Sequence, residues 1–193
     1  MKTVGPSRPK GRRPQHASRI ETWISVKVEL VQGRGDYVWP RPGRLFAAST
    51  NHTFAQLALA IDDAFARWDR SHMHEFELVD GTRIGIADPD DDDLLNGERL
   101  KLSRLKPGAQ FIYIFDLGDD WAHLCTVGEA PIHPIETLGI MPGEPLPYFG
   151  WGDIPDQYGR AREADDDETP LPPDPQLTDL PPLRPDWGPR RQS

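Results

Sequence analysis

Short stretches of alternating apolar and polar residues dominate the middle of the chain. Residues 24–31 alternate in this way and predict a strand, and residues 44–47 predict a shorter second one. Pro40 and Pro42 lie between these stretches and exclude a regular central strand there, because proline cannot donate to a sheet ladder. We therefore expect an edge or an irregular segment between the first two strands.

Apolar side chains recur at helical spacing over residues 53–68. Thr53 followed by Gln56 is a capping-box pattern, which predicts that the helix begins there. We expect this helix to cover the sheet with one apolar stripe, made of Phe54, Leu57, Ala58, Ile61, Phe65 and Trp68. The polar positions expected to face away from the sheet are Asp62, Asp63 and Arg67.

A second pair of strands, residues 74–78 and 82–86, predicts a hairpin. A two-residue turn would set Glu77 opposite Ile84 and mix polar with apolar side chains on each face. A three-residue loop with Gly81 in the left-handed conformation keeps the apolar side chains together. We expect the three-residue loop.

The densest apolar stretch spans residues 111–127, and the rest of the chain is organised around it. The aromatic and β-branched residues 111–115 predict a strand buried on both faces, and residues 121–127 predict its return partner. Phe115 then lies opposite Trp121. A hairpin that is apolar on both sides is expected at the centre of its sheet, and the acidic, glycine-containing residues between its strands form the turn.

These elements together predict an α+β fold, with a single mostly antiparallel sheet of five or six strands and one long helix packed on a face. Residues 20–130 form the expected domain, and a Pro- and aromatic-rich segment, 131–160, is expected to pack on it. The basic residues 1–19 and the acidic, Pro-rich residues 161–193 are expected to be disordered tails.

Composition narrows the classes of protein. The 193 residues carry a net charge of −9, which argues against a general nucleic-acid-coating surface. For the basic tail 1–19 a solvated, disordered segment is favoured, and the alternatives are a contact to nucleic acid or to a protein partner and a contact to the chain's own acidic tail. A single cysteine, Cys125, excludes internal disulfides and cysteine-rich zinc sites. No apolar run approaches the length of a membrane span, so we expect a cytoplasmic protein.

Residues of types suited to metal binding or catalysis lie near the turn of the central hairpin and beside the second hairpin. The candidate functional cluster is His72, His74, Asp116, Asp119, Trp121 and His123. Imidazole and carboxylate groups together suit a divalent metal ion, for which the candidate ligands are His74, Asp116, Asp119 and His123. No recognised metal-ligand spacing is present, and aspartates beside a turn glycine also cap backbone amides. We therefore expect a structural cluster without a cofactor, and a divalent metal site as the alternative.

Two motifs are distinctive: Asp-Leu-Gly-Asp-Asp-Trp-Ala-His at residues 116–123 and Ser-His-Met-His-Glu-Phe at residues 71–76. The first resembles the central hairpin of the plasmid pRiA4b ORF-3-like family, and the second is similar to another motif of that family. The resemblance covers roughly residues 23–127. It implies a bacterial plasmid or mobile-element setting, since such proteins are also described as insertion-element passenger, resolvase-like (TnpR) proteins, and it implies no defined reaction.

The resolvase label has a chemical requirement that the chain does not meet. A serine recombinase needs a nucleophilic serine activated near several arginines, and no serine here lies in such a pattern. Two hypotheses remain. The first is a non-catalytic binding or accessory module, and the alternative is a small metal-dependent hydrolase that uses the histidine and aspartate cluster.

Overall fold

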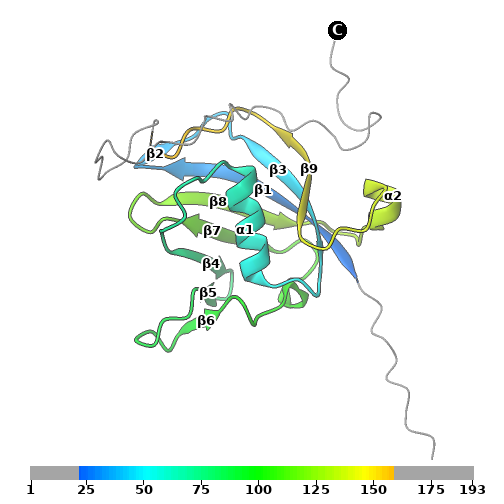
Figure 1. Ribbon diagram of the computed structural model, residues 1–193, viewed down its shortest axis with the longest axis horizontal. Coiled ribbons are helices and arrows are strands. Elements are labelled where there is room, and N and C mark those ends of the chain that lie inside the picture. The colour runs from blue at the N-terminus through cyan, green and yellow to red at the C-terminus, as the bar shows by residue number, and fades with distance from the viewer. Residues whose placement is uncertain (1–21, 159–193) are drawn as a thin grey trace, which may run out of the picture.

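One sheet of nine strands organises the computed structural model, which describes residues 22–158 (Figure 1). The strands are β1 (Trp23–Gly33), β2 (Asp36–Tyr37), β3 (Gly43–Ser49), β4 (His74–Leu78), β5 (Arg83–Gly85), β6 (Leu94–Asn96), β7 (Gln110–Phe115), β8 (Trp121–Val127) and β9 (Leu146–Trp151). The helical elements are α1 (Phe54–Ala64), α2 (Pro134–Leu138) and a 3₁₀ turn, η1 (Leu102–Arg104). The strand order is β6-β5-β4-β7-β8-β1-β3-β9, and β2 pairs with β1.

The expected α+β fold with five or six strands and one long helix is wrong. The chain is mostly β: the sheet has nine strands and is mixed, because β5 and β6 pair in parallel. Among residues 22–158, α1 is the one helix of seven or more residues. It ends earlier than expected, since Phe65 is its C-cap and Ala66 adopts a left-handed φ of 54°.

The start of α1 is as predicted. Thr53 accepts a hydrogen bond from the Gln56 amide, and the Gln56 side chain accepts one from the Thr53 amide, which completes the capping box. The expectation that Asp62 and Arg67 face away from the sheet is wrong, because both are buried. Asp62 lies at the border of the apolar stripe, and the early end of the helix turns Arg67 inward.

Both hairpin registers follow the sequence. Phe76 lies opposite Ile84, with Gly81 at a φ of 80° in the connecting loop. In the central hairpin Phe115 pairs with Trp121. This hairpin, β7 and β8, lies between β4 and β1 in the interior of the sheet.

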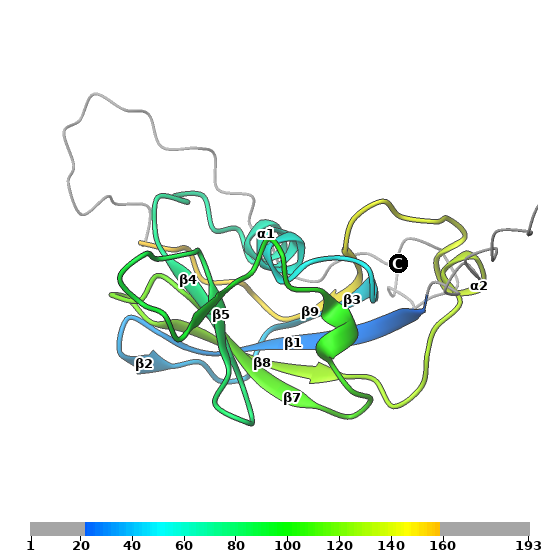
Figure 2. The same cartoon turned by 90° about the horizontal axis from the view of Figure 1, so that it is seen from below.

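The expectation that the central hairpin is buried on both faces is wrong. One face packs under α1, but Ile112, Ile114, Ala122 and Leu124 on the other face are only partly buried. Figure 2 shows α1 on one side of the sheet and no described element across the other side. The apolar side chains on both faces of this hairpin therefore reflect its central position in the sheet and not a second covering layer.

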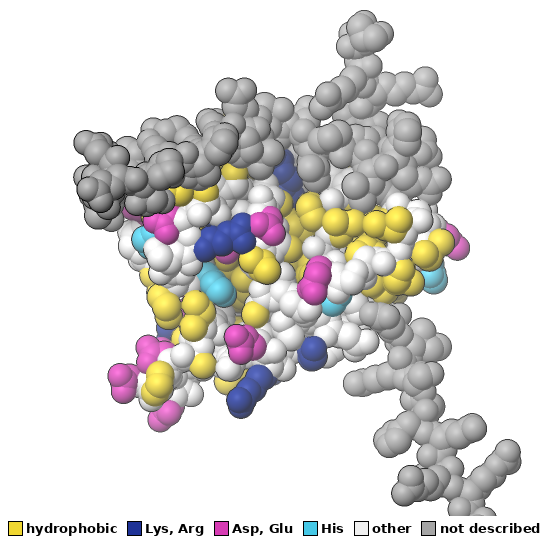
Figure 3. All heavy atoms as spheres, in the orientation of Figure 1, with side chains coloured by type: hydrophobic (Ala, Val, Ile, Leu, Met, Phe, Trp, Pro, Cys, Tyr) yellow, Lys and Arg dark blue, Asp and Glu magenta, His cyan; other side chains and the backbone are white. Residues whose placement is uncertain are grey.

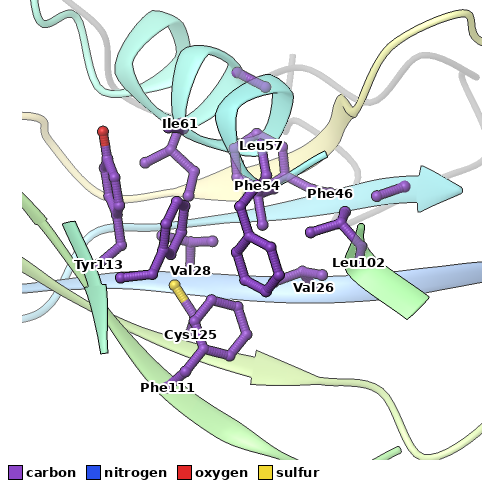
Figure 4. Close-up of a cluster of buried hydrophobic side chains, with 14 of the residues drawn as sticks. Val26, Val28, Phe46, Phe54, Leu57, Ile61, Leu102, Phe111, Tyr113 and Cys125 are labelled. Carbon is purple, nitrogen blue, oxygen red and sulfur yellow. The ribbon is translucent and has the colours of Figure 1, made fainter. Parts of the chain in front are cut away.

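The core lies between α1 and the sheet, where side chains from both hairpins and from β1 and β3 meet the helix (Figure 4). Its members that Figure 4 labels include Val28, Phe54, Ile61, Phe111 and Tyr113. The hydroxyl oxygen of Tyr113 lies on the helix side of the sheet. This orientation places one polar atom of the central hairpin directly beneath α1.

Segments outside the predicted domain also have defined roles. Within 131–158, β9 pairs with β3 and extends the sheet. The tails expected to be disordered, 1–19 and 161–193, lie outside the described residues. Among the residues that the structure describes, no helix is long and apolar enough to cross a membrane.

Candidate functional site

The turn of the central hairpin is held by one carboxylate. Asp116 adopts a left-handed φ of 58°, and its Oδ1 accepts hydrogen bonds from the amides of Gly118 (3.0 Å) and Asp119 (3.2 Å). The Asp119 side chain points outward and lies 3.6 Å from Arg34 Nε. The two aspartates therefore differ: Asp116 is a buried turn cap, and Asp119 belongs to a partly exposed ion pair.

A chain of polar side chains runs outward from Asp116. Its Oδ2 lies 3.1 Å from His72 Nδ1, and His72 Nε2 contacts the Tyr158 hydroxyl. Asp69 lies 3.6 Å from the same Nε2. Burial and the neighbouring carboxylates raise the pKa of Tyr158 to about 12, so its phenol stays protonated and is a poor nucleophile.

Residues 155–158, which follow β9, form a segment called the strap here, and it contacts residues 68–72 between α1 and β4. The side chain of Gln157 is fully buried, accepts from the Asp69 amide and donates to the Asp69 carbonyl, both at 3.1 Å. The Tyr158 ring meets Trp68 edge-on at 5.4 Å. The row of polar side chains that includes His72 and Tyr158 thus holds the strap against the domain.

A second polar group lies deeper, beneath α1. The Tyr113 hydroxyl donates to Asp62 Oδ1 at 2.7 Å. Burial raises the pKa of Asp62 to about 7, and the hydrogen bond from Tyr113 only partly opposes this. Burial and the same carboxylate raise the pKa of Tyr113 well above its ordinary value. Near neutral pH, Asp62 is thus poised between its neutral and charged forms.

Arg67 is the cation of this inner group. Its side chain is 1% exposed, and its guanidinium carbon lies 3.9 Å above the centre of the Trp121 ring. Burial lowers its pKa to about 10, opposed by the charges of Asp62, Tyr113 and Asp156, so it remains a cation. Within residues 22–158, the nitrogens of this inner group that are buried without a hydrogen-bond partner are Nε, Nη1 and Nη2 of Arg67, Nε1 of Trp121 and Nε2 of His123.

The Trp121 ring packs on backbone that only glycine allows. A Cβ on Gly33 would lie 2.1 Å from Cε3 of the indole. This approach lets the ring lie flat between β1 and Arg67. The indole also borders a cavity of about 360 Å³, lined by Gly33, Arg34, Asp36, Val38, Trp121 and Pro155.

Two of the candidate histidines, His123 and His74, are neutral. Nδ1 of His123 lies 3.3 Å from the Tyr113 carbonyl oxygen, and burial together with the Arg67 charge lowers the pKa of His123 to about 3. Burial also lowers the pKa of His74, whose ring is tilted against that of Tyr113 at 5.9 Å. Both imidazoles are therefore packed as neutral rings.

The structure divides the predicted cluster rather than gathering it. His72 and Asp116 are in direct contact, Trp121 and His123 belong to the inner group, Asp119 points outward and His74 packs on a ring. No group of three or more His, Cys, Asp and Glu side chains in the described part of the chain is placed to hold a metal ion.

Four residues of the site were missed in the sequence: Asp62, Arg67, Asp69 and Tyr158. Asp62 follows Ala58 by four residues, which places it at the border of the apolar stripe and could have marked it as half-buried. The aromatic segment that contains Tyr158 was expected to pack on the domain, but nothing local assigns it to His72. Arg67 had no sequence signal.

A protein-family model and a solved structure place the chain among known proteins. A model of the plasmid pRiA4b ORF-3-like protein family matches residues 23–136, which is more than half of the chain. A search of curated proteins finds no match. The crystal structure of the protein of unknown function MM3350 from Methanosarcina mazei Go1 is similar, with 26% identity, a TM-score of 0.51, and coverage of 67% of this chain and 69% of that one. The chain belongs to the plasmid pRiA4b ORF-3-like protein family.

Proposed function

We propose that this protein is a non-catalytic binding module that serves an accessory role on plasmids or mobile elements. Its ligand site is the cavity beside Trp121, at the turn end of the central hairpin. The mobile-element setting comes from the family to which the chain belongs. The single observation that carries the binding role is the cavity itself, with an indole wall and charged groups at its rim.

The cavity has the features of a ligand site. Its volume, about 360 Å³, is in the range of small-molecule pockets. Trp121 supplies an apolar wall, and Arg34 and Asp36 supply polar groups. The neighbouring side chains of Tyr37 and Trp39 are 82% and 83% exposed, and exposed aromatic residues are typical of binding surfaces.

The polar residues beside the cavity favour binding over catalysis. Asp116 is occupied by turn amides and His72, and the Tyr158 phenol is protonated. His123 has a lowered pKa of about 3, so it is a weak general base at neutral pH. No observation favours the alternative, a small metal-dependent hydrolase. Of its candidate ligands, His74 packs on the ring of Tyr113 and Asp119 pairs with Arg34, so neither contacts the other candidates.

The test uses the full chain, purified without chelators. Mixtures of small aromatic and polar fragments are added while amide and indole resonances are followed by NMR, and metal content is measured by elemental analysis. We expect saturable shifts at Gly33, Val38 and Trp121. One equivalent of metal that disappears in both His123→Gln and Asp119→Asn would overturn the proposal and make the hydrolase the leading hypothesis.

The charges on the α1 face do not supply a competing site. Figure 3 shows acidic, basic and hydrophobic side chains interspersed over that face, without a broad patch of one sign among the coloured residues. A binding surface for a polyanion such as duplex DNA requires several clustered cations. The described part of this face therefore favours a small or local ligand.

A further inference from the structure

The inner polar group contains a buried cation whose hydrogen-bonding capacity is unused. Arg67 is 1% exposed, and none of its three guanidinium nitrogens meets a hydrogen-bond acceptor within residues 22–158. A buried donor left unpaired destabilises the folded protein, and a charged donor does so more strongly. The stacking of Arg67 on Trp121 occupies the face of the guanidinium but leaves its in-plane N–H groups free to bind an acceptor.

Two neighbours of Arg67 add further hydrogen-bonding groups, one a donor and the other an acceptor. The Trp121 indole N–H is also buried without an acceptor, and it is a donor only. His123 is neutral, and its Nδ1 faces the Tyr113 carbonyl, so the proton is on Nδ1 and Nε2 is an acceptor. Side chains two apart on a strand share a face, which places Trp121 and His123 side by side. The group therefore offers charged and neutral donors together with one acceptor.

The cavity lies next to this group through Trp121, although Arg67 and His123 do not line it. Trp121 lines the cavity and also stacks on Arg67, so it connects the two. Pro155 of the strap lies on the cavity's rim, and the charge of the next residue, Asp156, is felt at Arg67. The ligand therefore reaches Arg67 and His123 when the strap is displaced from the indole.

The surrounding charges select the ligand. Asp62 and Asp156 already act on Arg67, so a dianion such as phosphate would meet repulsion from both carboxylates. A planar monoanion has less repulsion and matches the fork of a guanidinium with two parallel hydrogen bonds. The acceptor at His123 Nε2 favours a ligand that also carries a donor.

We propose that Arg67, Trp121 and His123 bind a small carboxylate that carries a hydroxyl group. The carboxylate accepts from Arg67 and the indole of Trp121, and the hydroxyl donates to Nε2 of His123. This inference rests on the proposed function and names the ligand class of the same site. A small acid enters from the cavity of about 360 Å³ and reaches Arg67 and His123, which do not line it, along the Trp121 indole.

The test titrates the full chain with three probes: glycolate, acetate and inorganic phosphate. The Trp121 indole resonance is assigned by comparison with Trp121→Phe and followed by NMR. We expect glycolate to shift it saturably and to bind about fivefold more tightly than acetate, which lacks the hydroxyl. Phosphate is expected to bind more weakly than either carboxylate. Arg67→Met should weaken glycolate binding by at least about tenfold, because the charge-assisted pair is lost.

A matched control and the contrary outcomes complete the test. Arg104→Met removes an arginine beside Asp80, at the other end of β4, and should leave glycolate binding unchanged. The comparison of glycolate with acetate needs no variant, so it decides the matter even where Arg67→Met does not fold. Equal affinities for the two acids, tighter binding of phosphate, or unchanged binding in Arg67→Met overturns the inference.

The same spectra separate this inference from the proposed function. Fragments that shift the amides of Gly33 and Val38 while glycolate shifts nothing overturn the carboxylate site and support the binding module. If no fragment and no anion shifts the resonances of the residues that line the cavity, both the carboxylate site and the binding module are overturned.

Discussion

Asp62→Asn should change how the stability of this protein depends on pH. Asp62 is 5% exposed, and its pKa rises from 3.8 to about 7 on folding, chiefly because burial disfavours the charged carboxylate. A carboxyl group whose folded pKa exceeds its unfolded pKa gives its full stabilisation below pH 3.8, and this is lost as the pH rises through about 7. Asparagine keeps an oxygen for the Tyr113 hydroxyl but cannot ionise.

The magnitude follows from the size of the pKa change. At about 1.4 kcal/mol for each pH unit, ionising Asp62 in the folded state costs roughly 4 kcal/mol at pH 8. The cost is close to zero at pH 4. The free energy of unfolding of the wild type, relative to Asp62→Asn, should therefore fall by several kcal/mol between pH 4 and pH 8.

Urea unfolding followed by tryptophan fluorescence across this pH range measures the effect. Asp63→Asn is the matched control, since its side chain is 64% exposed on the same helix and should leave the pH profile unchanged. Parallel wild-type and Asp62→Asn profiles would refute the reasoning, because they would mean that Asp62 titrates alike in the folded and unfolded chains.

Three further predictions concern the scaffold, each measured by urea unfolding. Thr53→Ala should cost about 1 kcal/mol, because the capping box at the start of α1 is lost. Gly33→Ala should cost about 1–3 kcal/mol, since its Cβ would overlap the indole that packs there, whereas Gly143→Ala, with open space around its Cβ, should be close to neutral. Asp116→Asn should cost about 1–3 kcal/mol through the buried turn network, and Asp119→Asn less, because its ion pair is partly exposed; equal costs would contradict this distinction.

The elements predicted correctly from the sequence are those set by local chemistry. The capping box at Thr53 and the left-handed Gly81 depend on residues within a few positions of each other. The register of the central hairpin follows from a short turn and strict alternation. In each case the interacting residues lie close together in the sequence, so the local sequence pattern predicts the interaction.

The strands that were missed depend on distant partners. β6 has three residues and pairs in parallel with β5, and nothing in so short a segment specifies that pairing. β9 contains Pro147, which argues against a strand, yet it forms the edge of the sheet beside β3. Counting these segments, and the two-residue β2, turns the expected five or six strands into nine.

The candidate site was predicted in part for the same reason. Asp116 beside Gly118 has the spacing of a turn cap, and the structure places it there. Arg67 was assigned to the outer face by extending a helical period beyond the point where the helix ends. The left-handed Ala66 interrupts that period, and its conformation depends on tertiary packing rather than on its side chain.

The buried Arg67 and Asp62 are unfavourable for stability. Removing a cation and a carboxylate from water costs several kcal/mol for each ion, and well-packed apolar residues in the same volume are often more stabilising. Here the Arg67 nitrogens have no hydrogen-bond partner within residues 22–158, and the attraction of Asp62 offsets only part of that cost. Local rules of stability are commonly broken at sites that serve function. The inner group breaks them beneath α1, beside a cavity that its own indole lines, and this coincidence is the physical reason to look for a ligand there.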